Sequence, residues 1–245
     1  MIKKNNKNTE FNHFSELSNE WWKPEGKFKI LHTLTPVRMK YIKSVLPKII
    51  KKNNKLNNPI YNLDVLDLGC GGGLICEPLS RLGANVTGVD FILENINVAK
   101  KHSKESNLNI KYFTKDLNKI KLNKKYDLIL ILEVLEHLEN WEEIISKIKK
   151  NLKPKGRIII STIDRNLLSY ALAIFFAENI LKWVPKKTHN FKNLIKPQEL
   201  INCLKKNNFK VIDITGLVFK PFLLEWHLSK KMNKINYFCT AIKTN

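Results

Sequence analysis

The stretch from Asp64 to Asp90, DVLDLGCGGGLICEPLSRLGANVTGVD, constrains the fold of this chain more than any other part of the sequence. It begins with an apolar run typical of a strand that is buried on both faces. A second apolar run, Val86 to Val89, leads to the closing acid. Between the two runs, Gly69 and Gly71 to Gly73 allow the backbone to turn tightly into a helix. The stretch therefore predicts a strand, a glycine turn, a helix and a second strand, which together form a ligand-binding unit of an α/β fold.

The glycine spacing indicates which ligand the turn accepts. Gly69, Gly71 and Gly73 form G-x-G-x-G, whereas the third glycine of the dinucleotide fingerprint would fall on Leu74, so a pyrophosphate fits poorly. Asp90 stands at about the distance from Gly71 at which an acid binds ribose hydroxyls. This pattern resembles the loop of class I S-adenosylmethionine (SAM) methyltransferases, whose cofactor carries no phosphate. A tight strand-to-helix turn without a ligand is the alternative.

The chain of 245 residues is long enough for a full core, and one α/β domain is the simplest expectation. Its formal charge of +21 would ordinarily suggest nucleic acid or an anionic membrane as a partner. The basic residues, however, are 39 Lys and only 4 Arg, scattered among 29 Asn. A composition bias therefore explains the charge better than a nucleic-acid site does. The four cysteines show no paired spacing, which predicts neither a zinc site nor a disulfide framework.

The remaining sequence predicts an α/β fold with a Rossmann-like sheet of seven strands under an N-terminal helical cap. Residues 1–10 are expected to be a disordered tail, 11–62 the cap and 63–245 the main domain, with an insertion at 165–190. Thr35 and Pro36 are predicted to open a helix that continues through Met39 to Ile50. Arg38 then faces either a ligand carboxylate or solvent. The predicted strands are 63–68, 86–89, 110–113, 126–132, 157–161, 209–214 and 235–242, the last pair forming a hairpin-like addition.

Two acids and a histidine follow the fourth predicted strand. Strand ends at this edge of an open α/β sheet face the ligand crevice, so Glu133, Glu136 and His137 are expected near the substrate. If the backbone becomes helical there, the three side chains share one face and can share one cation. The alternative is a helix start whose acids favour the helix dipole. Similarly, Asp116 after the third strand can meet an adenine amine or cap its own loop.

The segment from Asn166 to Val184 is strongly apolar between basic flanks. It is too short to span a bilayer, but its flanks carry Arg165, Lys182, Lys186 and Lys187, as in an interfacial helix. Burial beneath the cap is the alternative. The sequence shows no secretory signal and no stretch of about 20 apolar residues, so the protein is expected to be soluble or peripheral.

Five motifs in order resemble the ubiquinone biosynthesis O-methyltransferase family over the chain from about Trp21 onward. They are WWKPEGKFKILHTLTPVRMKYI from Trp21, VLDLGCGGG from Val65, LEVLEHL from Leu132, STIDRN from Ser161 and VPKKTHNFKNLIKPQEL from Val184. The resemblance implies O-methylation of a polyprenylated catechol or phenol in ubiquinone biosynthesis, in both O-methylation steps (2-polyprenyl-6-hydroxyphenol methylase and 3-demethylubiquinol 3-O-methyltransferase).

The resemblance also implies site residues and partners. SAM is expected to be bound by Arg38 through its carboxylate, by Gly69 and Gly71, by Asp90 through its ribose and by Leu132 beside the adenosine. A divalent metal, with Mg²⁺ the expected ion, is implied at Glu133, Glu136 and His137. His137, Glu136 and His189 are the catalytic candidates, and His137 takes the proton if no metal binds. Asp164 and Asn190 depart from the common family pattern.

The family further implies a peripheral position on a membrane, through the apolar segment after strand five. The protein is expected in the cytoplasm at the inner membrane, or on the matrix side in a mitochondrion, with other ubiquinone-biosynthesis enzymes as further partners. Two rival functions remain: an RNA methyltransferase drawn by the +21 charge, and an inactive scaffold. The intact Gly69 to Gly73 loop and Asp90 argue against the scaffold.

Overall fold

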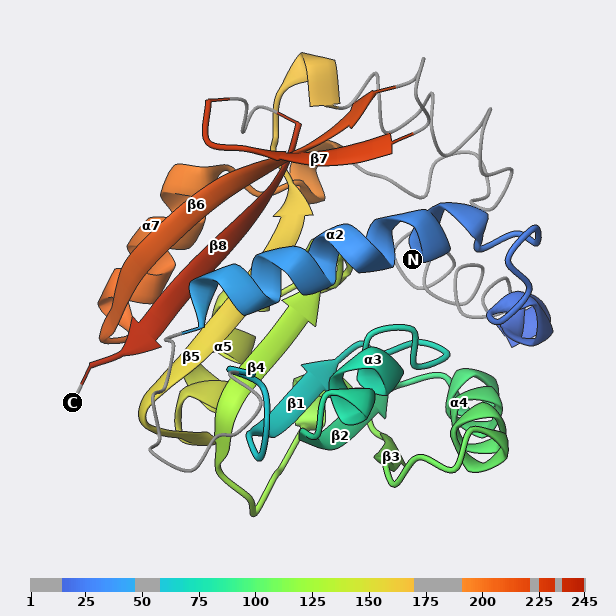
Figure 1. The fold of residues 1–245 in the computed structure, drawn as a ribbon. Coiled ribbons are helices and arrows are strands. Elements are labelled where there is room, and N and C mark those ends of the chain that lie inside the picture. Colours follow the sequence, from blue (N-terminus) through green and yellow to red (C-terminus); the bar gives the residue numbers. More distant parts are fainter. Residues whose placement is uncertain (1–14, 47–57, 170–190, 221–224, 232–234, 245) are drawn as a thin grey trace, which may run out of the picture.

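A mixed sheet of eight strands forms the centre of the computed structural model, which describes residues 15–46, 58–169, 191–220, 225–231 and 235–244 (Figure 1). Its strand order is β3-β2-β1-β4-β5-β8-β6-β7. The strands are β1 Asp64–Leu68, β2 Asn85–Asp90, β3 Lys111–Thr114, β4 Tyr126–Leu132, β5 Leu152–Ile163, β6 Phe209–Lys220, β7 Glu225–Ser229 and β8 Asn236–Lys243.

The order in which successive strands are added to the sheet reverses between β1 and β4. Strands β2 and β3 lie on one side of β1, strands β4 and β5 lie on the other, and all five run parallel. Strand β8 is antiparallel and lies between β5 and β6. In a sheet of this kind the ligand crevice forms outside the carboxyl ends of the strands, at the point of reversal. This edge holds the residues that follow Leu68, Val89 and Leu132.

Helices cover both faces of the sheet (Figure 1). One face packs against α2 Lys29–Val45, α3 Cys76–Arg81 and α4 Leu93–Glu105, and the other against α5 Trp141–Lys149 and α7 Pro197–Lys206. Successive residues of β4 alternate between the two cores: Leu128 and Leu130 lie in the first, and Ile129 and Ile131 lie in the second. This alternation explains why the predicted strands read as continuous apolar runs.

The sheet has one strand more than predicted. Strand β6 continues past Ile214 to Lys220, and its second half pairs with β7, from Gly216 opposite Ser229 to Lys220 opposite Glu225. The predicted last pair are antiparallel neighbours, as β6 and β8. Strand β7 was missed because its sequence, EWHLS, is short and only half-buried, which leaves no run of apolar residues to detect.

The predicted start of the N-terminal helix is wrong. Helix α2 begins at Lys29, so Pro36 lies inside it rather than in its first turn. A proline in this position lacks the N–H group that would bond to the carbonyl four residues earlier. The buried side chains of Phe28 and Leu34, which are 0% and 4% exposed, hold the early turns against the domain. Tertiary packing therefore extends the helix across a residue that ordinarily breaks one.

The described residues contain no helix long and apolar enough to cross a membrane. Most of the predicted apolar helix and of the insertion at 165–190 lies outside the described residues, as do the tail at 1–10 and His189. These predictions remain predictions.

Candidate active site

The glycine turn between β1 and α3 adopts a backbone that other residues rarely accept. The φ angles of Gly69, Gly71 and Gly73 are 75°, 52° and 91°. A Cβ atom on Gly73 would stand 2.4 Å from the Tyr112 hydroxyl, and one on Gly69 would stand 2.3 Å from Val134. The turn is therefore possible only with glycine at these positions. The loop passes directly beneath its neighbours and presents main-chain groups instead of side chains.

Asp90, at the end of β2, ties this loop to the neighbouring strand. Its Oδ2 accepts a hydrogen bond from the Gly71 amide at 2.9 Å, and its Oδ1 accepts one from the Ile92 amide at 2.9 Å. The side chain is only 6% exposed, and burial raises the pKa of its carboxyl although the amide donors oppose that rise. Asp90 therefore lies at the end of the second strand, as expected, and it has a structural role that the sequence did not reveal. Its binding of the ribose stays a prediction.

Trp21 packs directly on the glycine loop. A Cβ on Gly71 or on Gly72 would come within 2.4 Å of its side chain. The indole Nε1 donates to Asn95 Oδ1 at 2.7 Å, and the ring stacks on Phe28 with centroids 3.9 Å apart. Asn95 in turn bonds to Asp90, which connects the N-terminal segment to the end of β2. The tryptophan motif was noticed in the sequence, but this role was not predicted.

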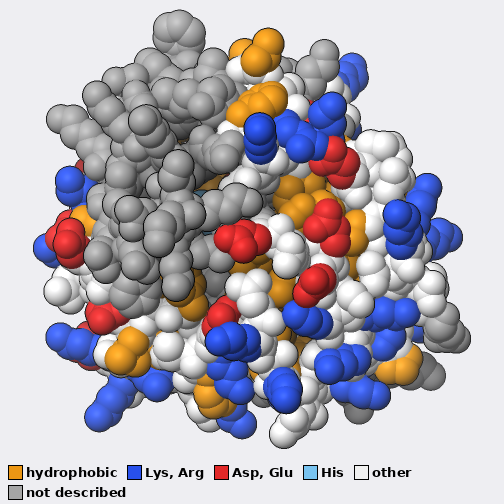
Figure 2. Space-filling view, turned by 180° about the vertical axis from the view of Figure 1, so that it is seen from behind, with side chains coloured by type: hydrophobic (Ala, Val, Ile, Leu, Met, Phe, Trp, Pro, Cys, Tyr) orange, Lys and Arg blue, Asp and Glu red, His pale blue; other side chains and the backbone are white. Residues whose placement is uncertain are grey.

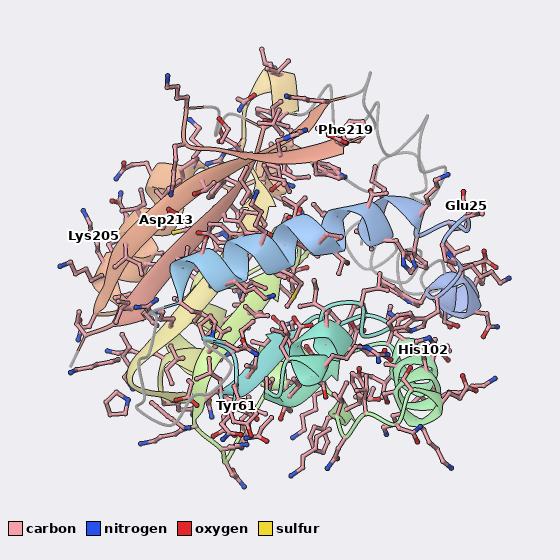
Figure 3. All side chains as sticks on the ribbon, viewed as in Figure 1. Glu25, Tyr61, His102, Lys205, Asp213 and Phe219 are labelled. Carbon is pink, nitrogen blue, oxygen red and sulfur yellow. The ribbon has the colours of Figure 1, made fainter. Side chains whose placement is uncertain are left out.

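Trp22 makes a second contact with the same loop. Its indole Nε1 donates to the Gly72 carbonyl at 2.9 Å. The ring stacks on His102 of α4 with centroids 3.6 Å apart and an interplanar angle of 4°, and His102 projects toward this segment (Figure 3). His102 Nδ1 lies 2.6 Å from Oε1 of Glu77, which is 1% exposed. The N-terminal segment is thus fixed to the loop and to two helices.

Arg38 of α2 is buried beside three acids rather than exposed to solvent. Arg38 is only 6% exposed, and its Nη2 lies 3.9 Å from Oε1 of Glu133. The carboxylates of Glu133, Asp67 and Glu136 favour its charge, while burial lowers its pKa. Its Nε and Nη2 have no hydrogen-bond acceptor among the described residues. Unmatched buried donors of this kind fit the carboxylate of an amino-acid ligand, as SAM provides.

Glu133 begins the segment after β4 in a left-handed conformation, with φ at 57°. Its Oε1 accepts a hydrogen bond from the Ser161 hydroxyl at 2.6 Å. The Asn236 amide Nδ2 lies 3.3 Å from each of its carboxylate oxygens. Ser161 and Asn236 belong to β5 and β8, so no local sequence signal linked them to Glu133. An uncommon backbone angle held by three strands indicates a functional position.

Glu136 is buried one turn further along, in the 3-10 helix η3 Leu135–His137. Its side chain is 4% exposed, and its Oε2 accepts from the Thr162 hydroxyl at 2.9 Å. Burial and, to a smaller extent, the charge of Glu133 raise the pKa of Glu136 to about 7, although His137 and Thr162 act to lower it. Burial likewise raises the pKa of Asp67 to about 6. Both acids therefore titrate near neutral pH, which is typical of catalytic groups.

The predicted shared helical face at Glu133, Glu136 and His137 is not formed. Glu133 is left-handed and only Leu135–His137 is helical, as a 3-10 turn, so the i, i+3, i+4 relation of an α-helix does not apply. Among the described residues, no group of three or more His, Cys, Asp or Glu side chains is placed to hold a metal ion. The three residues therefore form no metal cluster as they stand, and the implied metal remains a prediction.

Two further predicted contacts have clear positions. Leu132 ends β4 at the ligand edge and is 8% exposed. Asp116 caps its own loop, because its Oδ1 accepts from the Asn118 amide at 2.9 Å. The loop-capping alternative for Asp116 is therefore confirmed.

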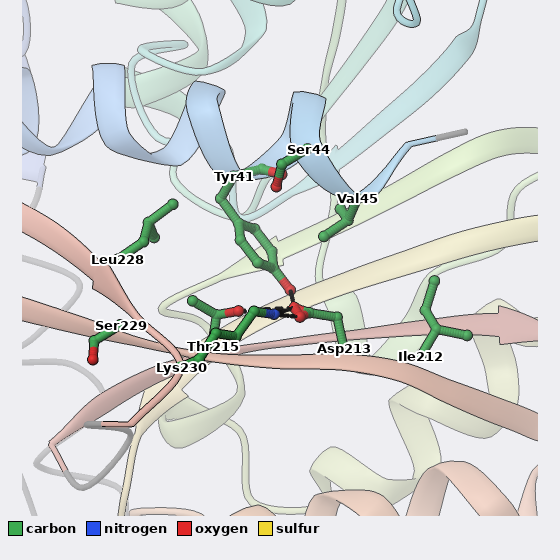
Figure 4. Close-up of a pocket in the computed structure, with 9 residues that line it drawn as sticks. All are labelled: Tyr41, Ser44, Val45, Ile212, Asp213, Thr215, Leu228, Ser229 and Lys230. Atoms are coloured by element: carbon green, nitrogen blue, oxygen red, sulfur yellow. Dashed lines mark hydrogen bonds and ion pairs between the residues drawn. The ribbon is translucent and has the colours of Figure 1, made fainter. Parts of the chain in front are cut away.

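A cavity of about 450 Å³ lies between α2 and the strands β6 and β7, lined by Tyr41, Ser44, Val45, Ile212, Asp213, Thr215, Leu228, Ser229 and Lys230 (Figure 4). Its polar groups bond to one another. Asp213 Oδ2 accepts from Thr215 at 2.8 Å and from Lys230 at 2.5 Å, and the hydroxyls of Tyr41 and Thr240 are 2.7 Å apart. Because these polar groups already have hydrogen-bond partners within the protein, they indicate a structural cluster instead of a ligand site.

Charge is dispersed over the face of the molecule that Figure 2 shows. On the back of the molecule, Lys and Arg side chains are spread out with Asp and Glu among them (Figure 2). Such a pattern agrees with the composition argument for the +21 charge.

Comparison with known proteins identifies the family. A methyltransferase-domain family model matches residues 38–214. Ubiquinone biosynthesis O-methyltransferases are similar along nearly their whole length: that of Bartonella bacilliformis is 43% identical, covering 94% of this chain and 92% of the relative, and that of Pelagibacter ubique is 41% identical, covering 96% and 97%. The chain belongs to the ubiquinone biosynthesis O-methyltransferase family. The predicted family and enzyme class, a SAM-dependent O-methyltransferase of ubiquinone biosynthesis, are confirmed.

Solved structures agree with the family at the level of the fold. A magnesium protoporphyrin IX methyltransferase from Synechocystis with bound S-adenosylhomocysteine (SAH) has a TM-score of 0.59 at 22% identity, covering 84% of each chain. A SAM-dependent methyltransferase from Thermotoga maritima has a TM-score of 0.67 at 14% identity, covering 96% of this chain and 100% of its own. The predicted class I SAM-methyltransferase fold is thereby confirmed for this family member.

Proposed function

We propose that the chain transfers the methyl group of SAM to a ring hydroxyl of a polyprenylated catechol or phenol, in both O-methylation steps of ubiquinone biosynthesis. The observation that carries the proposal is the burial of Arg38 with two unmatched donors at the edge of the sheet where the glycine loop and Asp90 lie. Near-full-length similarity to the named relatives supports the substrate class.

In this proposal Arg38 binds the carboxylate of the cofactor, and the main chain at Gly69 and Gly71 lies against it. Asp90 binds the ribose hydroxyls through the lone pairs that the Gly71 and Ile92 amides and Asn95 leave free. Leu132 packs beside the adenosine. The bound cofactor supplies an electrophilic methyl group on sulfur, so the protein has to align the acceptor oxygen with that methyl and exclude water.

The acceptor hydroxyl must lose its proton as the new C–O bond forms and the C–S bond breaks. A phenol with a pKa near 10 is a weak nucleophile at neutral pH. Glu136 is the candidate for the general base, since its pKa of about 7 lets it accept a proton at neutral pH. His137 is adjacent, and His189, outside the described residues, remains a proposed contact.

A divalent cation remains part of the proposal on the strength of the family resemblance alone. Glu133, Glu136 and His137 supply the oxygen and nitrogen ligand types for it, but no step is derived through it, since they do not form a metal cluster as they stand. Methyl transfer that stops in excess chelator, while SAH binding persists, would support the cation. Full activity in chelator would leave proton transfer to Glu136 and His137.

We also propose that the enzyme acts as a peripheral protein on the inner membrane, because its substrate carries a polyprenyl tail. Each CH₂ group of the tail held in the bilayer resists extraction by about 0.8 kcal/mol. Leu167 and Leu168, at the start of the apolar segment, are 80% and 54% exposed. Replacing both Phe175 and Phe176 by Glu should abolish co-sedimentation with anionic vesicles and spare turnover of a short soluble catechol.

The deciding experiment compares methyl acceptors. Purified protein with radiolabelled SAM should methylate a catechol bearing one or more prenyl units and leave bulk tRNA unlabelled. If tRNA is labelled and the catechol is not, the RNA methyltransferase alternative is favoured over the proposed function. SAH titration calorimetry on the same sample excludes an inactive scaffold if it shows micromolar binding.

A further inference from the structure

Asn236 stands at the catalytic edge of the sheet without belonging to any motif. It is the first residue of β8, where it pairs with Ile163 of β5 and Leu217 of β6. Because β8 runs antiparallel to β5, its first residue lies where the parallel strands end. This is the edge that carries Glu133 and Glu136, and the hydrogen bonds from Asn236 to Glu133 confirm the proximity.

The orientation of the Asn236 amide follows from its neighbour. Nδ2 lies 3.3 Å from both oxygens of the Glu133 carboxylate, which also receives the Ser161 hydroxyl and faces the Arg38 guanidinium. Turning the amide over would place its oxygen against those acceptor oxygens. Oδ1 therefore points away from Glu133, where it is buried and has no donor among the described residues.

An unmatched buried acceptor points to a ligand that donates a hydrogen bond. The cofactor is the less suitable donor, because its predicted glycine-loop and ribose contacts lie at β1 and β2, whereas β8 is the third strand from β1. At a strand spacing of roughly 4.8 Å, this separates Asn236 from the glycine loop by on the order of 14 Å. The group that the cofactor is expected to place nearer to Asn236, beside Arg38, is a carboxylate, which has no hydrogen to donate. A group bound over β4, β5 and β8 is thus the methyl acceptor.

We propose that Asn236 contacts the acceptor: its Oδ1 accepts a hydrogen bond from the ring hydroxyl adjacent to the one that is methylated, while its Nδ2 holds Glu133. The inference rests on the proposed function, since it assumes a catechol substrate. It makes Asn236 a determinant of the preference for two adjacent hydroxyls, because a phenol with one hydroxyl leaves Oδ1 unmatched.

The test measures how SAH-loaded protein binds two soluble probes, a catechol and a phenol that each carry one prenyl unit. The wild-type protein should prefer the catechol by on the order of tenfold. Asn236→Leu should abolish this preference, so that it binds the catechol no better than the phenol, because any loss that comes from releasing Glu133 is common to both probes. SAH affinity should not change. Asn202→Leu, on the exposed side of α7, is the matched control and should keep the preference.

Ser161→Ala separates the two roles of the site, because it removes a donor to Glu133 without touching the proposed subsite. Ser161→Ala should lower the affinities for the catechol and the phenol by the same factor. If Asn236→Leu lowers the affinities for the catechol and the phenol by the same factor, or lowers the affinity for SAH together with them, the inference is overturned. Asn236 then only supports Glu133. Wild-type protein that binds SAH but neither probe overturns the proposed function, and the inference with it.

Discussion

The two halves of the site differ in how their buried polar groups are satisfied. In the loop half, formed by the glycine turn, Asp90 and the N-terminal tryptophans, the protein supplies the partners itself: Asp90 receives two amides and Trp22 bonds to Gly72. In the acid half, formed by Arg38, Glu133, Glu136 and Asn236, buried donors and an acceptor remain unmatched. The loop half is therefore built in advance, whereas the acid half keeps buried groups that are still available to bond to a ligand.

Replacing Arg38 should produce the largest effect on the acid half. Arg38→Met keeps the length of the side chain but removes both unmatched donors and the charge that faces three carboxylates. SAH affinity should fall by on the order of 100-fold or more, about 3 kcal/mol, as when one partner of a buried charge pair is lost. Titration calorimetry measures it. Lys40→Met, on the exposed side of the same helix, should leave the affinity unchanged, and equal affinities for both variants would contradict the role of Arg38.

Stability should respond to pH through Glu136 of the acid half and through the buried Asp67 of β1. Burial raises the pKa of Asp67 to about 6 and that of Glu136 to about 7, so the folded protein holds these protons more tightly than the unfolded chain. Their stabilising contribution is full below the unfolded pKa values, near 4, and is lost as the pH rises through 6 and 7. The free energy of unfolding should fall over this window by at most on the order of 3 kcal/mol for each group.

Glu136→Gln removes one of these titrations while preserving size. Urea unfolding at pH 5 and pH 8 should then show a smaller difference than in the wild type. Glu142→Gln, on the exposed face of α5, serves as the control and should retain the wild-type difference. A steep pH dependence that survives in Glu136→Gln would place the titrating group elsewhere.

Changing Asp90 should affect the loop half in both stability and binding. An amide at this position has one acceptor oxygen, so Asp90→Asn can satisfy only one of the two main-chain donors, Gly71 and Ile92. We expect a loss of about 1–2 kcal/mol in stability and roughly a tenfold loss in SAH affinity. Asp116→Asn is the control, because Asp116 also caps an amide but is exposed. Weaker SAH binding with unchanged stability would mean that Asp90 acts on the ligand alone.

The smallest effect is expected at the tryptophan contact. Trp22→Phe retains an aromatic ring to stack on His102 and loses only the donor to the Gly72 carbonyl. SAH affinity should fall by about threefold to fivefold, equivalent to about 1 kcal/mol. Trp141→Phe on α5 should not alter it. A loss in Trp22→Phe as large as that in Arg38→Met would show that the loop half is less complete than its hydrogen bonds indicate.

The loop half was predictable because its signals are local. The strands around Gly69 to Gly73, the position of Asp90 and the boundaries of β4 follow from apolar runs, glycines and spacing over about 30 residues. The start of α2 did not follow, because the packing of Phe28 outweighs the propensity of Pro36 to begin a helix.

The acid half was predictable only in part. Its acids follow β4 in the sequence, but Glu133 is held by Ser161 and Asn236, which are 28 and 103 residues away. Whether Arg38 is buried depends equally on packing over the sheet and not on its neighbours in the chain. The shared helical face failed because a left-handed Glu133 breaks the helical spacing that the prediction required.

The position of β8 has a consequence for how the chain acquires its fold during synthesis. Every other strand of the described sheet is made before β8, yet β8 lies between β5 and β6 and pairs with both. Until it leaves the ribosome, the facing edges of β5 and β6 have no partner, and Tyr41 lacks Thr240, its partner 199 residues later. Unpaired strand edges of this kind associate readily with other chains. The nascent protein is thus expected to be prone to aggregate until β8 emerges, and chaperones then have these open edges to protect.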